Sequence, residues 1–125
     1  MSTLKVGTIQ DTNGANPSTA EQMSKGRAKA WVNFDGKFNT SPFTTANGGI
    51  RSAFNVSSVT DNGAGDYTVA FSSAMPDANY AVALSHKSDT DNTTGSGARP
   101  MIRRGPANNY STTSVRIINS NVSSG

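Results

Sequence analysis

The residues that could do chemistry are few, and most of them fall in one polar stretch. It runs from the only histidine, through the sequence KSDTDNTTGSG at 87–97, to an arginine. Carboxylate and amide oxygens on a flexible loop would suit calcium, and the mixed hydrogen-bonding groups could instead contact a glycan. A solvated loop without a ligand is the competing interpretation. The candidate receptor-contact residues are His86, Lys87, Asp89, Asp91, Asn92 and Arg99.

The remaining carboxylates form no catalytic pattern. Asp61, Asp66 and Asp77 lie in turn sequences, where aspartate is favoured because it bonds its own backbone. A general acid with a raised pKa needs burial, and these positions look solvated. One histidine and no cysteine exclude a multi-histidine metal site and a cysteine-based zinc site. We therefore expect a protein that is not an enzyme and has no cofactor.

The elements that must carry the polar loop are strands, and the strongest signal is FNVSSVTDNGAGDYTVAF at 54–71. Its second half, 67–71, alternates large apolar residues with small or polar ones, as in a half-buried strand. In its first half Phe54 and Val56 share a face, and a bulge at 57–58 would keep the next valine on that face. The Asn, Asp and Gly residues between the halves predict an antiparallel hairpin.

Further strands follow from the same period of two. It predicts strands at 80–85, 99–104 and 114–119, and no stretch after residue 30 has a helical period. The predicted fold class is therefore all-β, a small antiparallel β-sandwich or jelly-roll-like domain over residues 28–125.

Residues 1–27 read as an extended N-terminal arm with one short helix. Ser18 and Glu21 match a capping box, and Gly26 would end the helix within two turns. So short a helix is not stable alone, and the arm must dock on its own domain or on a neighbouring subunit. The candidate interface with a neighbouring subunit or another partner consists of Leu4, Val6, Ile9, Met23 and Trp31.

Trp31, the only tryptophan, lies in the segment AKAWVNFDG at 28–36. Strand alternation places Val32 and Phe34 on the core face and Trp31 on the opposite face. It would pack against the arm or a neighbouring subunit, or it would form a stacking platform for a ligand such as a sugar.

Composition limits the partners. Hydrophobic residues make up 34% of 125 residues, which is thin for a self-sufficient core and favours oligomerisation. The sequence pI is about 9.5, but the basic residues are spread out and lack interleaved aromatics, so we expect no nucleic-acid binding. No apolar run is long enough for a membrane span, and no secretory signal is apparent. We therefore expect that the protein folds and assembles in a cytoplasm and does not insert into a membrane.

Three stretches carry a resemblance to a known family. AKAWVNFDG, the hairpin sequence FNVSSVTDNGAGDYTVAF and AMPDANYAV resemble a domain of tail-fibre and related virion proteins of tailed phages, especially cyanophages. The opening STLKVGTIQDTNGANPSTAEQ is similar to the segment that precedes that domain. The resemblance is good over residues 2–84 and loose beyond them.

The resemblance implies a homotrimeric fibre or knob, attached to other virion proteins through its N-terminal arm and contacting a host glycan or protein. Such proteins commonly add an apolar strand after the one at 114–119, where this sequence has Asn121 to Gly125. The expected function is a short tail fibre or fibre tip for host attachment, located in the virion. A capsid decoration, head-fibre or cement protein is the alternative, and a polysaccharide-acting tail enzyme is a third.

Overall fold

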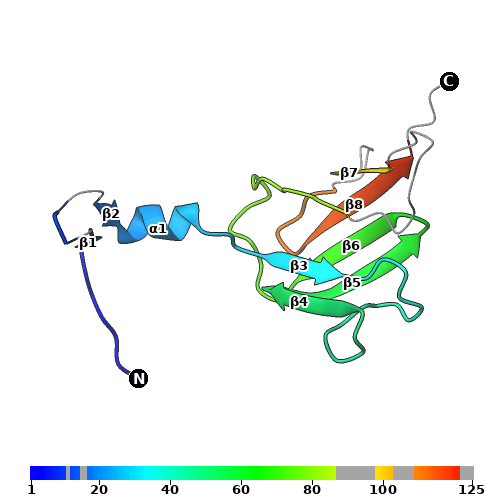
Figure 1. Cartoon of the computed structure of the whole chain (residues 1–125), viewed down its shortest axis with the longest axis horizontal. Helices are drawn as coiled ribbons and strands as arrows, with labels where there is room; N and C mark the ends of the chain where they lie inside the picture. The colour runs from blue at the N-terminus through cyan, green and yellow to red at the C-terminus, as the bar shows by residue number, and fades with distance from the viewer. Residues whose placement is uncertain (11, 15–16, 87–97, 103–108, 122–125) are drawn as a thin grey trace.

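The computed structural model describes residues 1–10, 12–14, 17–86, 98–102 and 109–121. This part of the chain is mostly β, with antiparallel sheets and one short helix (Figure 1). The elements in chain order are β1 (Thr8–Ile9), β2 (Ser18–Thr19), α1 (Ala20–Gly26), β3 (Trp31–Phe34), β4 (Ile50–Phe54), β5 (Val56–Gly63), β6 (Asp66–Phe71), β7 (Ala98–Ile102) and β8 (Ser114–Asn121).

The predicted hairpin forms one half of a four-stranded antiparallel sheet with the order β5-β6-β8-β7, in which β6 and β8 are the central strands. Strands β5 and β6 meet through Ala64 and Gly65, and Gly65 has a φ of 71°, a left-handed conformation that glycine adopts without strain. The predicted bulge is confirmed, because the register shifts between Val56 and Ser58. The strand predicted at 114–119 is also confirmed, as β8.

A second sheet, the pair β3–β4, lies beside the first, and the core fills the space between them (Figure 1). Phe43 is fully buried, and its backbone exchanges two hydrogen bonds with Val59 of β5, at 2.7 and 3.0 Å. The other buried members of this core are Ile50, Val59, Val69 and Val115. The connection between β3 and β4 therefore supplies the centre of the core, although its sequence is rich in turn residues.

Two predictions about strands are wrong. Phe54 does not share a face with Val56, because the chain changes sheets at Asn55, which has a φ of 53°. The strand predicted at 80–85 is not formed, although Tyr80 and Val82 pack against the core. This segment is held by side chains instead of a ladder: the Tyr80 hydroxyl donates to the Ser111 carbonyl at 2.8 Å, and its ring meets Phe71 edge to face.

The strand predicted at 99–104 is observed as β7, and residues 103–108 lie outside the described residues. Its partner is β8, with Met101 opposite Ile118. Met101 is partly exposed, whereas Ile102 packs against the core.

The N-terminal arm projects away from the two sheets (Figure 1). Its helix has seven residues and ends at Gly26, as predicted. The helix begins at Ala20, so Thr19 and not the predicted Ser18 precedes it, and Ser18 pairs with Ile9 in the small β1–β2 ladder. None of the described helices is long and apolar enough to cross a membrane.

Candidate functional site

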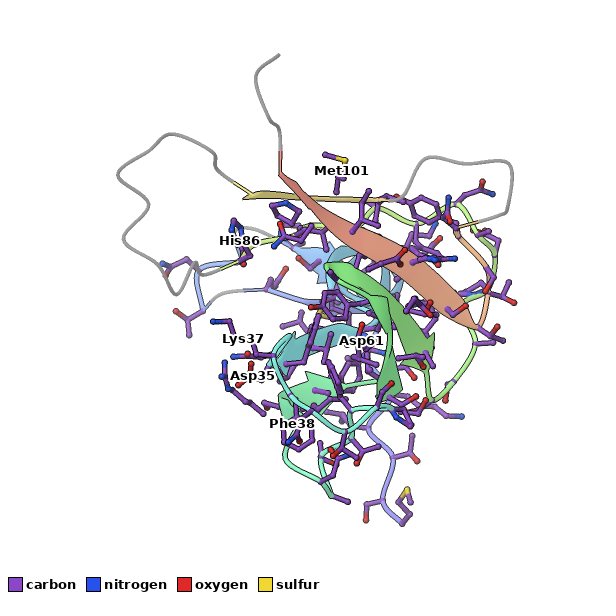
Figure 2. All side chains as sticks on the ribbon, turned by 90° about the vertical axis from the view of Figure 1, so that its right-hand side faces the viewer. Asp35, Lys37, Phe38, Asp61, His86 and Met101 are labelled. Carbon is purple, nitrogen blue, oxygen red and sulfur yellow. The ribbon has the colours of Figure 1, made fainter. Side chains whose placement is uncertain are left out.

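Of the predicted receptor-contact residues, only His86 has a described side chain. It is exposed and lies apart from Asp35 and Lys37 (Figure 2). The backbone of Arg99 is in β7, opposite Ser120, but its side chain is outside the description. Lys87, Asp89, Asp91 and Asn92 also lie outside the described residues, so the loop stays a prediction.

The five carboxylates that the structure describes all have structural partners. Glu21 pairs with Lys25, Asp35 with Arg51 and Asp66 with Arg116, whereas Asp61 and Asp77 accept hydrogen bonds from the backbone amides of Gly63 and Asn79. Within the described ranges, no three His, Cys, Asp or Glu residues gather where they could hold a metal ion. Four of these carboxylates therefore stabilise turns, loops and strand pairs, and Glu21 pairs with a lysine of its own helix.

The ion pair between Asp66 and Arg116 was not anticipated from the sequence. Both guanidinium contacts are short, with Nε to Oδ1 at 2.7 Å and Nη2 to Oδ2 at 2.8 Å. The hydrogen bond to Asp66 raises the pKa of Arg116. Arg116 lies opposite Thr68 on β6, two residues from Asp66, so the pair joins β6 and β8 diagonally.

Tyr67 also has a structural role. Its hydroxyl donates to the Gly36 carbonyl at 2.9 Å, and its ring meets Phe34 edge to face with centroids 5.1 Å apart. Burial raises the pKa of the phenol, and the nearby charges of Asp61 and Asp35 raise it further. The phenol is therefore held neutral and fastens the loop after β3 to β6.

The outer face of β3–β4 carries two exposed aromatic side chains. Trp31 is 48% exposed and Phe54 is 52% exposed, and the two residues are directly opposite each other in the antiparallel register. Opposed residues project from the same face of a sheet. The predicted outward orientation of Trp31 is confirmed, because Val32 and Phe34 of the same strand pack against the core. We call this pair the aromatic face.

A hollow of about 330 Å³ adjoins the aromatic face where the arm joins the body. Its lining residues are Arg27, Ala28, Lys29, Phe54, Asn55 and Ser73. Two of these residues are cationic and none is acidic. Arg27 forms no ion pair or hydrogen bond within the described part of the chain, so its charge remains available. The hollow thus combines positive charge, amide and hydroxyl groups and one edge of an aromatic ring.

Asn55 holds this hollow together. Its amide nitrogen donates to the carbonyls of Lys29 and Ser73, each at 3.1 Å, and its amide oxygen accepts from the Ser73 amide at 2.7 Å. The Lys29 ammonium in turn donates to the carbonyl and the hydroxyl of Ser24 in α1. One side chain therefore connects the root of the arm, the end of β4 and the segment after β6.

The predicted interface residues of the arm are all exposed. Leu4 is 86% exposed and Ile9 is 52% exposed, and Val6 and Met23 also present apolar surface to solvent. Their contact with another subunit or protein stays a prediction.

Sequence reasoning identified Trp31 but missed Phe54, Arg27 and Lys29 as its neighbours. The missed signal is Asn55, which lies between two runs of β-branched and aromatic residues, because asparagine tolerates a left-handed turn between strands.

Comparison with protein-family models, with curated proteins and with solved structures finds no match to this chain.

Proposed function

We propose that this chain is a structural protein of a phage virion, a short tail fibre or fibre tip that works as a homotrimer in host attachment. In this proposal the body is a small β-sandwich of jelly-roll-like type, and residues 1–27 fix it to other virion proteins. The observation that carries the proposal is the exposed apolar surface of the arm, from Leu4 to Met23.

Exposed apolar side chains on an arm this small are unfavourable in free energy unless a partner covers them. Burial of a leucine or isoleucine side chain stabilises by about 1.5–3 kcal/mol, so covering several such side chains contributes a substantial binding free energy. The helix has only seven residues and contributes little order by itself. The arm therefore suits a role as an attachment segment, and the resemblance to phage fibre domains supplies the assembly to which it would attach.

The test uses substitutions in the full chain. Replacing Leu4 and Ile9 together by serine should lower the oligomeric mass measured by light scattering and reduce incorporation into particles. Lys5→Ser, an exposed change on the same segment, is the matched control and should leave both unchanged. A wild-type chain that is monomeric at micromolar concentration would refute the trimer.

A capsid decoration protein is the second candidate, supported by the same arm, because both locations need an attachment segment. The two differ in what the free protein does. A fibre tip should compete with phage for host cells when it is added in excess, whereas a shell-reinforcing protein should not compete and should instead raise the temperature at which particles release their genome.

A polysaccharide-acting enzyme receives no support from the described carboxylates, since each already binds a cation or a turn amide. Asp89 and Asp91 lie outside the described residues. Replacing both by asparagine, followed by an assay of reducing-end release from host polysaccharide, tests this third interpretation.

A further inference from the structure

We propose that the aromatic face and the adjoining hollow form a binding site for an acidic saccharide, a sugar chain with carboxylate groups. The site deepens the proposed attachment function by naming the ligand class, and it rests on that function only for its biological meaning. The binding itself can be tested with purified protein.

The aromatic part of the site suits a sugar ring. Trp31 and Phe54 are about half exposed, directly opposite each other on one sheet face. The apolar face of a pyranose can cover such rings, because aromatic side chains present flat, amphipathic surface that is easily desolvated. Asn33 and Ser52 are opposite each other one pair further along the same face and offer amide and hydroxyl groups to sugar hydroxyls.

The charged part of the site selects for an anion. Arg27 and Lys29 line the hollow beside Phe54, and no carboxylate lines it. The guanidinium of Arg27 is free of ion pairs in the described structure and can bind a carboxylate through two parallel hydrogen bonds. Lys29 donates to Ser24, yet an ammonium has three donors, so it can still contact a ligand.

The number of cations argues for a saccharide over a nucleic acid. Single-stranded nucleic acids are bound along grooves in which successive phosphates meet many cations while bases stack on aromatic rings. Here two cations lie together at one end of a two-ring platform, which suits one carboxylate next to one stacked ring. A packed subunit would be a poorer fit to the hollow, because two cations without an acidic neighbour would be desolvated.

The experiment uses the only tryptophan as its reporter. Trp31 fluorescence of the full chain is titrated with an oligogalacturonate hexamer and, separately, with neutral maltohexaose. We expect a saturable change in emission with the acidic hexamer and affinity at least about tenfold weaker for the neutral one, as loss of one charge-assisted contact implies. Added salt should weaken only the acidic interaction.

Substitutions locate the site. Arg27→Ala should weaken oligogalacturonate binding about tenfold. Arg51→Ala, which removes the same charge from a cation already paired with Asp35, should change it less than about twofold. Trp31→Ala, followed by calorimetry and with circular dichroism to confirm folding, should abolish binding of the hexamer.

Three results of the binding measurements would overturn the proposal. They are no saturation at millimolar hexamer, equal losses for the two arginine variants, and tighter binding of an oligothymidine of the same charge. A fall in oligomeric mass on Trp31→Ala without loss of hexamer binding would assign the aromatic face to a subunit interface, and so would also refute it. If the hexamer does not bind but the protein still oligomerises and attaches to particles, the saccharide site is refuted and the proposed function is not.

Discussion

Replacing Asn55 is the sharpest test of how the arm, the aromatic face and the body are connected. Asn55→Gly keeps the freedom to adopt the observed φ of 53° but removes the side chain's hydrogen bonds to Lys29 and Ser73. Asn55→Ala removes the same bonds and also places a Cβ-bearing residue with no compensating side-chain bond in the left-handed region. The two variants therefore separate the hydrogen bonds from the backbone conformation.

The magnitudes follow from the three contacts of 3.1, 3.1 and 2.7 Å. A net contribution of about 0.5–1 kcal/mol for each partly solvated hydrogen bond gives a loss of about 2 kcal/mol for Asn55→Gly. The left-handed conformation adds about 1 kcal/mol for alanine. For a domain of this size, 1 kcal/mol corresponds to a shift in Tm of about 4–8 °C, so the glycine variant should melt about 8–16 °C lower.

The assay is urea and thermal unfolding at one fixed protein concentration, because oligomerisation makes the apparent stability depend on concentration. Asn79→Ala, an exposed asparagine whose backbone but not side chain is hydrogen-bonded to Asp77, is the matched control and should change stability by less than about 0.5 kcal/mol. The expected order of stability is wild type and Asn79→Ala, then Asn55→Gly, then Asn55→Ala. A glycine variant as stable as wild type would refute the role of the hydrogen bonds, and equal losses for the two Asn55 variants would refute the backbone argument.

Three further predictions concern the core, one turn and the response to pH. Phe43→Ala should lower the free energy of unfolding by about 3–5 kcal/mol in urea, because it empties the fully buried centre of the core; a loss below 1 kcal/mol would show that this centre is not packed. Gly65→Ala should lower the free energy of unfolding more than Gly48→Ala, although both glycines have a positive φ. A Cβ at position 65 would lie 2.6 Å from a carbonyl oxygen of β8, whereas a Cβ at position 48 would meet open space. Equal losses of stability would contradict this steric explanation. The folded-state pKa of Tyr67 is raised above 10.0, so the stability that this phenol contributes is present below pH 10 and is lost as the pH rises through 10 and the folded pKa. The Tm measured from pH 8 to 11.5 should therefore fall less steeply for Tyr67→Phe than for the wild type. An unchanged slope would exclude this phenol as a source of the loss of stability at alkaline pH.

The parts of the fold that follow from local sequence were predictable. The hairpin of β5 and β6, its bulge and its glycine turn depend on alternation and on backbone geometry within 54–71. The short helix and its end at Gly26 are equally local. The outward orientation of Trp31 needed only the period of two along β3.

What depends on contacts distant in sequence could not be predicted. Phe43 lies among turn residues, and only the pairing of its backbone with Val59 makes it the centre of the core. At 80–85 the alternation of apolar residues was correctly identified, but burial of Tyr80 and Val82 against the core produces that pattern with or without a ladder. Phe54 was assigned to the wrong sheet because the alternation of apolar residues continues across Asn55. In the structure the chain leaves β4 at this residue and enters β5 of the other sheet.

The change of sheet at Asn55 also explains why the candidate site could not be identified from the sequence. The sequence separates Phe54 from Trp31 by 22 intervening residues and shows Arg27 and Lys29 as scattered charges, so no local pattern joins an aromatic platform to cations. They meet because β3 and β4 pair in antiparallel register and because Asn55 ties the end of β4 to the Lys29 carbonyl. Lys29 also fastens α1 through Ser24. The residue that turns the chain from one sheet into the other therefore also binds the root of the arm, so the proposed ligand site and the attachment segment meet at one hydrogen-bonded joint.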